Sequence, residues 1–294
     1  MTVVPFGNFA AGNLAEFADT TCHSDRVTVG ACASLGGNSA IFSAQAPTQC
    51  YGDTAKVRVH QLGFAGAAIN LDPGSSFWWC QSVRRTLTAQ GSAPRPVLSE
   101  IHQSGNNGCD PLKAGPAPFN LQVRDQGGSK WWALIVRGAN DCGSPGFVQH
   151  AWTKLGAIDD NGIDRLQHDW GAGVSPLVTQ GEWVHWLFGW KMGATPATGW
   201  FEAWCCRNGQ TMQSIVARTN IATCYPLPNY PLLSLYFDSA ETGLAEYEYA
   251  AGAFGDDFAE LQAWQNSRLS PALGYNVNPN AGGGAGGGGT TTVS

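Results

Sequence analysis

Residues 181–210 read GEWVHWLFGWKMGATPATGWFEAWCCRNGQ, and this stretch holds five of the chain's twelve tryptophans. It consists of two runs in which aromatic residues recur at every second position, separated by a loop rich in Gly, Pro and Thr. A period of two is typical of β-strands, and a loop of this composition is typical of the turn between them. The stretch therefore predicts a β-hairpin.

The alternation of a β-strand assigns the side chains of the first run to two faces. We expect Trp186, Phe188 and Trp190 to point into the core. His185 and Lys191 then lie on the opposite, outer face. These three aromatic residues are accordingly predicted to be scaffold.

The second run places Trp200, Glu202 and Trp204 together on one face of its strand. The adjacent Cys205 and Cys206 must point to opposite faces of the same strand, so they cannot serve one partner. The three residues that share a face are therefore expected to form one aromatic and polar patch.

Short runs of the same kind recur along the chain, each bounded by Gly, Pro, Asn or Asp. They are VTVGA (27–31), KVRVHQL (56–62), PVLSEIHQ (96–103), PFNLQVRD (118–125), KWWALIVRG (130–138), QSIVART (213–219), LLSLYFD (232–238) and AEYEYAAG (245–252). Helical periodicity is confined to a weak signal over residues 256–265. Many short strands at this spacing predict an all-β protein, an antiparallel β-sandwich or jelly roll.

The composition excludes several classes of protein. The 294 residues carry a net charge of −6, and no run of Lys or Arg is present, so we expect no nucleic-acid partner. No apolar stretch approaches the roughly 20 residues that cross a bilayer, so we expect no membrane insertion. The N-terminal residues lack the basic and apolar regions of a secretory signal, and we expect none in this chain.

Nine cysteines are present, at positions 22, 32, 50, 80, 109, 142, 205, 206 and 224. Their spacing matches no zinc motif, and some could form disulfides while at least one stays unpaired. Residues 253–258, AFGDDF, lack the alternating ligands of a calcium loop and are predicted to be a turn and a helix start. We therefore expect no cofactor, and a structural Ca²⁺ ion is an alternative that no motif supports.

The chain is predicted to have three parts. Residues 1–49 form an N-terminal extension that contributes the first strands, and residues 50–265 form a jelly-roll domain active on or binding carbohydrate. Residues 266–294 form a tail whose GGGAGGGG run (282–289) is either a flexible linker or an assembly segment.

Polar residues recur opposite the apolar face in other strands. Arg58 and His60 share one face of their strand, and Glu100 and His102 share one face of theirs. Tyr236 lies opposite the leucines of its strand. With Lys191 and the second tryptophan run, these residues predict one polar and aromatic sheet face, which becomes a cleft if the sheet curves. Such a face suits sugars, although polar side chains on an antiparallel sheet can also simply face solvent.

The order of these motifs resembles that of concanavalin-like polysaccharide lyases. W-V-x-W-x-F-x-W-K followed by G-W-x-E-x-W resembles the paired central strands of the heparin-lyase-like jelly rolls. SEIHQ resembles the Q-x-H strand of alginate and glucuronan lyases, and the strands at PAPFNLQVRD, LYF and AEYEYAAGAFGDDF follow in the order of that family. The resemblance covers roughly residues 50–264 and implies a jelly roll of the concanavalin A-like lectin and glucanase type.

The resemblance implies β-elimination at a uronic acid, with a base, an acid and a group that neutralises the carboxylate. It makes His60 or His102 the base, it makes Tyr236 the acid or both acid and base, and it gives Glu100 the neutralising position. Arg58 could bind a substrate carboxylate through two hydrogen bonds. The substrate-binding candidates are Arg58, Lys191, Trp200, Glu202 and Trp204.

Two positions depart from the family pattern. Glu100 replaces an amide, and an ionised Glu100 would repel a uronate; Asp238 stands where alginate lyases carry a lysine. The two carboxylates favour a neutral sugar, a bound cation or a site without catalysis. A glycoside hydrolase using two of Glu100, Glu202 and Glu248 is a further alternative, although no E-x-D-x-x-E motif is present.

The chain ends and the odd cysteine count favour a protein released in a particle, such as a phage tail or fibre component that binds host-surface glycan. The expected partners are a polysaccharide and either other virion proteins or a second copy of the chain through the tail. The expected location is a virion or the cell exterior. An active polysaccharide lyase and a structural tail or decoration protein are the alternatives.

Overall fold

A computed structural model provides the coordinates of the chain. The structure describes residues 3–17, 19–22, 24–45, 49–50, 54–60, 71–86, 96–103, 117–126, 129–138, 148–152, 165–168, 177–238, 243–270 and 274–275. Within some of these strands only the backbone is described, and this applies to Arg58, His60 and Tyr236.

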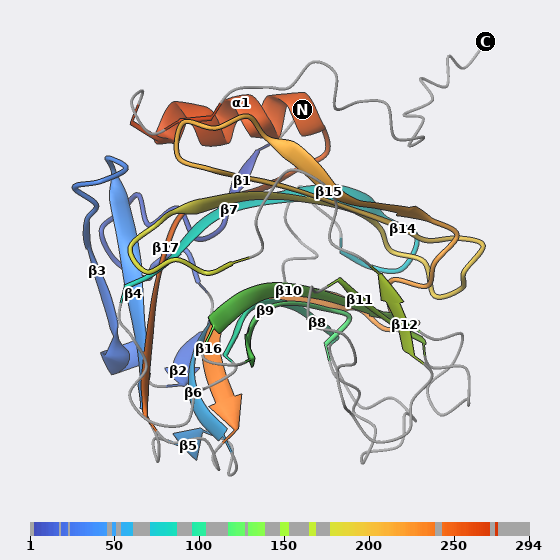
Figure 1. Cartoon of the computed structure of the whole chain (residues 1–294), viewed down its shortest axis with the longest axis horizontal. Helices are drawn as coiled ribbons and strands as arrows, with labels where there is room; N and C mark the ends of the chain where they lie inside the picture. Colours follow the sequence, from blue (N-terminus) through green and yellow to red (C-terminus); the bar gives the residue numbers. More distant parts are fainter. Residues whose placement is uncertain are drawn as a thin grey trace.

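Two curved sheets stack on each other, as Figure 1 shows. The eight-stranded sheet has the order β15-β14-β13-β7-β17-β4-β3, with β1 paired to β17. Its strands are β1 (Val4–Pro5), β3 (Val27–Ala31), β4 (Asn38–Gln45), β7 (Ser76–Arg85), β13 (Val184–Lys191), β14 (Trp200–Arg207), β15 (Gln213–Thr219) and β17 (Leu244–Gly255).

The nine-stranded sheet has the order β12-β11-β10-β9-β8-β16-β6-β2, with β5 paired to β6. Its strands are β2 (Asp19–Cys22), β5 (Gln49–Cys50), β6 (Thr54–His60), β8 (Val97–Gln103), β9 (Phe119–Gln126), β10 (Ser129–Gly138), β11 (Val148–Trp152), β12 (Arg165–His168) and β16 (Asn229–Asp238). A short 3₁₀ helix, η1 (Ser24–Arg26), precedes β3. Apart from β11 and β12, the paired strands are antiparallel, and the predicted all-β sandwich of jelly-roll type is confirmed.

The hairpin predicted from residues 181–210 is β13 paired with β14. Trp186, Phe188 and Trp190 are fully buried in the core between the sheets, as alternation predicted. Across the core, the ring of Trp132 on β10 meets that of Trp186 edge-on, with centroids 5.5 Å apart. Burying each such ring contributes about 1.5–3 kcal/mol, so the aromatic residues of β13 hold the two sheets together.

Cys205 and Cys206 also follow the alternation of β14. Cys205 belongs to the core between the sheets, and Cys206 belongs to a smaller buried cluster on the other side of the eight-stranded sheet. The cysteines whose side chains are described carry free thiols: Cys32, Cys80, Cys205, Cys206 and Cys224. The other four lie outside the described side chains, so the expected disulfides stay a prediction for them.

The helix predicted over residues 256–265 is α1 (Phe258–Arg268). Asp257 is its N-cap, and its carboxylate accepts a hydrogen bond of 2.9 Å from the Glu260 amide, as expected for a helix start. Figure 1 shows α1 on the outer face of the eight-stranded sheet. The helix runs past the expected boundary at residue 265, and Leu269 and Tyr275 beyond it are buried, so the packed part of the chain extends into the predicted tail.

His185 lies on the outer face of its strand, β13, as alternation predicted, but it is buried there and does not reach solvent. Its side chain is 0% exposed, and its ring lies 5.9 Å, centroid to centroid, from that of Tyr275. Its Nδ1 atom lies 2.8 Å from Ser82 Oγ, and its Nε2 atom lies 2.9 Å from Asn208 Oδ1. Both ring nitrogens are therefore satisfied, and Ser82 also accepts a 3.4 Å hydrogen bond from Gln265 Nε2 of α1.

An irregularity in the nine-stranded sheet is stabilised from the opposite sheet. The pairing of β8 with both neighbours shifts register near Leu98, which breaks the ladder there. The hydroxyl of Tyr249, on β17, lies 2.5 Å from the Ser234 carbonyl oxygen and 3.1 Å from the Leu98 carbonyl oxygen. Tyr249 thus satisfies a buried carbonyl that the bulge leaves outside the ladder.

Among the described residues, no helix has both the length and the apolar character that a membrane crossing requires.

Candidate functional site

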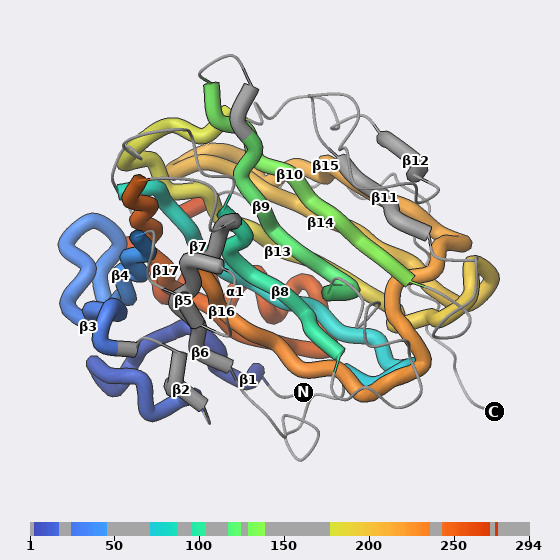
Figure 2. Tube along the Cα trace, turned by 90° about the horizontal axis from the view of Figure 1, so that it is seen from below, coloured from blue at the N-terminus to red at the C-terminus, as the bar shows by residue number. Residues whose placement is uncertain are grey.

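The candidate catalytic residues lie on three adjacent strands, β6, β16 and β8. Leu232 pairs with His60 on one side and with Glu100 on the other, so the Cα atoms of the latter two are roughly 10 Å apart. Ser234 pairs with Arg58. Figure 2, viewed from the side of this sheet, shows β10, β9, β8 and β16 running next to one another. The fold therefore brings these segments, distant in sequence, to one sheet.

Glu100 and His102 project from the face turned away from the core. Their neighbour Ile101 belongs to the core, and the Ser99 hydroxyl donates a 2.8 Å hydrogen bond to Gln81 Oε1 on the opposite sheet. Strand alternation then places Glu100 and His102 on the other face. Figure 1 shows that the sheet arches, with this face on its concave side.

Glu100 belongs to a row of three polar residues across β8, β9 and β10. The Nδ2 atom of Asn120 donates to Glu100 Oε1 over 2.6 Å, and Asn120 Oδ1 accepts from Arg137 Nη1. Arg137 also donates to the Ala117 carbonyl over 3.0 Å. The exposed fractions of Glu100, Asn120 and Arg137 are only 4%, 2% and 5%. The amide thus links a buried cation to a buried carboxylate and has its orientation set by both.

His102 is half-buried beside this row. Its Nδ1 atom lies 2.9 Å from the Gln103 carbonyl oxygen, which can only accept, so Nδ1 carries the proton. Its Nε2 atom has no hydrogen-bond partner among the described residues. The ring lies 5.6 Å, centroid to centroid, from that of Tyr230, the residue opposite it on β16. A neutral imidazole with an unprotonated Nε2 is the form that a general base requires.

Asn120, Arg137 and Tyr230 were not among the residues singled out from the sequence. The sequence pattern could have identified Asn120 as a residue of the outer face, because Asn120, Gln122 and Arg124 alternate with the core residues of β9. That alternation places all three polar side chains on the face of Glu100. The pattern around Arg137 is less informative, because Arg137 lies near the end of a largely apolar strand.

The expectation that one sheet face gathers all the candidates is wrong. Trp200, Glu202 and Trp204 alternate with core residues of β14, and they project from the outer face of the eight-stranded sheet. Lys191 is exposed on that same outer face of β13. Because the two sheets lie between this face and that of Glu100, these four residues cannot contact a sugar bound beside His102.

The three carboxylates of the hydrolase alternative are also dispersed. Glu248 is on β17, where it accepts hydrogen bonds from Ser39 Oγ at 2.5 Å and Arg84 Nε at 2.6 Å. Two strands separate it from Glu202 on β14, a spacing of roughly 14 Å. Glu100 lies in the other sheet. Since paired carboxylates of glycosidases stand about 5–9.5 Å apart, no two of these three form such a pair.

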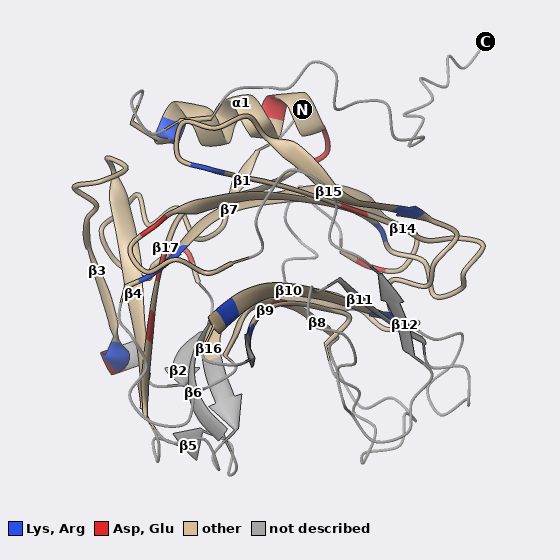
Figure 3. Cartoon of the chain, in the orientation of Figure 1, with Lys and Arg blue, Asp and Glu red and all other residues tan. Residues whose placement is uncertain are grey.

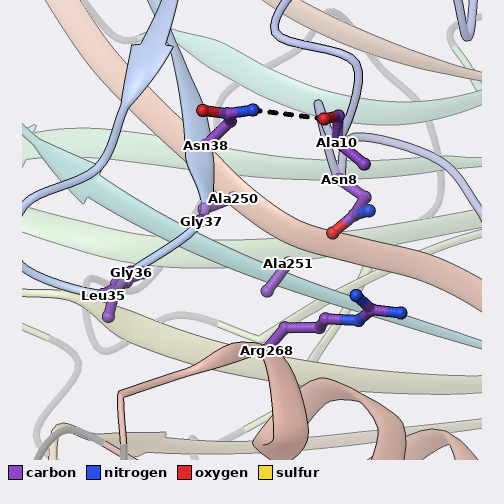
Figure 4. A pocket seen from close by; sticks show the side chains of 9 residues that line it. All are labelled: Asn8, Ala10, Leu35, Gly36, Gly37, Asn38, Ala250, Ala251 and Arg268. Atoms are coloured by element: carbon purple, nitrogen blue, oxygen red, sulfur yellow. Dashed lines mark hydrogen bonds between the residues drawn. The ribbon is translucent and has the colours of Figure 1, made fainter.

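A pocket of about 220 Å³ lies away from these candidates, beside β17 and the end of α1. Figure 4 shows Asn8, Asn38 and Arg268 around it, with Asn38 bonded to the backbone of the N-terminal segment. The pocket opens on the side of the eight-stranded sheet that carries α1, and it holds none of the candidate residues.

Charged side chains are sparse over both sheets, as Figure 3 shows. Within the described part of the chain, no three His, Cys, Asp or Glu side chains come together as metal ligands.

No protein-family model matches the sequence, and no curated protein sequence matches it. The structure is similar to that of an endo-β-1,4-glucuronan lyase from the fungus Trichoderma reesei, with a TM-score of 0.59 and 14% identity over 85% of this chain and 95% of that one. It is also similar to a GH131 β-glucanase catalytic domain from Podospora anserina, with a TM-score of 0.54 and 10% identity over 88% of this chain and 97% of that one. At these identities the likeness establishes the fold, a jelly-roll β-sandwich that occurs in a polysaccharide lyase and in a glucanase.

Proposed function

We propose that this chain is a polysaccharide lyase that cleaves uronate-containing glycans by β-elimination on the concave face of the nine-stranded sheet. The observation that carries the proposal is the position of His102, whose Nε2 atom has no hydrogen-bond partner among the described residues, beside the row of Glu100, Asn120 and Arg137. The similarity in fold to a glucuronan lyase supports the same reaction class.

In this reaction, His102 Nε2 takes the proton from C5 of the uronate. The electron pair of the C5–H bond forms the C4–C5 double bond, and the C4–O bond to the leaving sugar breaks. The leaving oxygen receives a proton from a tyrosine hydroxyl. Tyr230, whose ring is next to that of His102, is the first candidate for this acid. Tyr236 pairs with Val97, five residues along β8 from His102, which puts its backbone roughly 16 Å away.

The substrate carboxylate needs a neutralising group to acidify its C5 proton. We assign this to Asn120, because its amide nitrogen has a second hydrogen beyond the one donated to Glu100. Arg137 offsets the charge of Glu100 through the same amide. In this proposal the amide that the lyase pattern places at position 100 comes from Asn120 on the next strand, while the carboxylate of Glu100 stays in the site.

The test is incubation with glucuronan and with alginate, followed by the ultraviolet absorbance of the unsaturated uronyl product. The wild type should form product, His102→Ala should lose at least about 100-fold in rate, and Tyr230→Phe should lose more than Tyr236→Phe. Glu260→Gln, on the exposed surface of α1, should leave the rate unchanged. Absence of product with every uronate polymer would end the lyase proposal.

A non-catalytic glycan-binding role is the second candidate, because Glu100 places a carboxylate on the proposed uronate site. Binding of a polymer without product formation would favour this role if the binding is lost in His102→Ala.

Neither the fold nor the comparisons support a phage tail or fibre component. Location in a virion or outside the cell, and partners joined through the tail, stay predictions.

A further inference from the structure

The outer face of the eight-stranded sheet carries a cluster of half-exposed aromatic rings, which we call the tryptophan shelf. It consists of Trp78, Trp200, Trp204 and Phe258. The ring centroids of Trp78 and Trp200 are 5.8 Å apart, and those of Trp204 and Phe258 are 5.2 Å apart. Phe258, at the start of α1, meets Trp78 edge-on at 4.9 Å and joins the two pairs. The rings therefore form one continuous surface.

The strand register explains why these rings meet. Trp78, Gly189 and Glu202 lie in one row across β7, β13 and β14. A Cβ atom on Gly189 would lie 2.5 Å from the six-membered ring of Trp78, so that ring occupies the space a side chain at 189 would fill. The missing side chain lets Trp78 lean towards β14 and reach Trp200.

Two charged side chains adjoin the rings. Glu202 accepts a 3.3 Å hydrogen bond from Trp204 Nε1, and its other carboxylate oxygen has no partner among the described residues. Lys191 is exposed and pairs in register with Trp200. An acceptor and a donor thus border half-exposed aromatic rings, and such a combination can orient a sugar.

The charges near the shelf decide which sugar class fits. Glu202 is in the middle of the shelf, and the exposed Asp256 and Asp257 precede Phe258. Three carboxylates against one lysine disfavour a polyuronate, whereas a carboxylate accepts hydrogen bonds readily from neutral hydroxyl groups. We propose that the tryptophan shelf is a second carbohydrate-binding site, which holds a neutral hexose polysaccharide.

The proposed site is independent of the cleavage site, because it lies on the opposite outer face of the sandwich. A neutral polymer bound to the shelf leaves the face of His102 open to a second chain. The shelf would therefore hold the protein on a matrix that contains both neutral and uronate polymers, and its function does not require that cleavage occurs.

The experiment is affinity electrophoresis of the full chain in gels that contain hydroxyethylcellulose, a mixed-linkage β-glucan, galactomannan or alginate. Wild-type protein should be retarded by at least one neutral polymer. Trp200→Ala should weaken that retardation by about fivefold or more, the loss expected for a ring that contributes to binding. Trp200→Phe, which keeps a ring, should lose less. Trp264→Ala is the matched control, since Trp264 is a half-exposed tryptophan of α1 outside the shelf.

The outcomes separate this proposal from that of the lyase. Loss of retardation in Trp200→Ala, with an unchanged rate on short soluble uronate oligomers, supports a separate site. Equal loss in Trp200→Ala and Trp264→Ala, or no retardation of the wild type by any neutral polymer, would overturn the proposal. Either result leaves the test of His102 unaffected. If Trp200→Ala does not fold, Glu202→Ala provides the second test, and undiminished binding in that variant counts against the shelf.

Discussion

The amide nitrogen of Asn120 on β9 lies 2.6 Å from the carboxylate of Glu100 on β8. Both groups are buried on a face turned away from the core, where an unpaired polar group is costly. The pair is the centre of the proposed site, because it fixes the amide that we expect to meet the substrate carboxylate.

Asn120→Ala should lower the free energy of unfolding by about 1–3 kcal/mol, because it removes a hydrogen-bond partner from both Glu100 and Arg137. Urea denaturation measures the change. The control is Asn8→Ala, a half-exposed asparagine without a side-chain hydrogen bond among the described residues. Its effect should stay within about 0.5 kcal/mol. Equal stability of the two variants would contradict the role of the row.

Glu100→Gln should raise kcat/KM on polyuronates by about tenfold. The change removes a negative charge from the carboxylate site, and a like charge at about 4 Å costs more than about 1.4 kcal/mol at the effective dielectric of a protein surface. Its amide oxygen can still accept from Asn120. Glu260→Gln makes the same chemical change on exposed α1 and should have no effect. A loss of activity in Glu100→Gln would instead assign the carboxylate a direct part in the reaction.

Tyr249→Phe should destabilise the protein by about 1–2 kcal/mol, because the Ser234 carbonyl loses its hydroxyl donor and the Leu98 carbonyl keeps only the Ser234 hydroxyl at 3.3 Å. Tyr247→Phe is the matched control on the same strand, since no hydrogen bond of the Tyr247 hydroxyl occurs among the described residues. Chemical denaturation of both variants gives the comparison. If the Tyr247 variant proves the less stable of the two, the bulge does not depend on Tyr249.

Burial raises the pKa of Glu202, and the hydrogen bond from Trp204 lowers it less than burial raises it. A carboxyl with a raised pKa in the folded state binds its proton more tightly there than in the unfolded chain. Its contribution to stability is therefore complete below the unfolded pKa and is lost as pH rises through the folded pKa. Wild-type stability should fall relative to that of Glu202→Gln as pH rises from about 4 towards 7. Parallel pH profiles of the two proteins in urea denaturation would contradict the raised pKa.

The sequence determined the local structure of the chain. Alternation in residues 181–210 predicted the hairpin and the buried positions of Trp186, Phe188 and Trp190, because side-chain direction in a strand depends only on position parity. The same pattern separated Cys205 from Cys206. Asp257 marked the start of α1 because a short acidic side chain caps free amides locally.

The sequence could not assign a strand to a sheet. Glu100 and Glu202 both alternate with core residues, yet they lie on opposite outer faces of the sandwich. Alternation reports only whether a side chain points towards the core or away from it, and a sandwich has two faces that point away. Which of these two faces a residue occupies is set by strand order.

Only the tertiary structure decided the composition of the candidate site. Asn120 reaches Glu100 because β9 pairs with β8, and His185 is buried beside Tyr275, a residue 90 positions further along the chain. These contacts join segments that are far apart in the chain, and their formation depends on long-range pairing and packing. The residue pattern of a strand is local and does not specify which strands pair with it. The sequence therefore indicated the strands and their inner faces, but not the partners of Glu100.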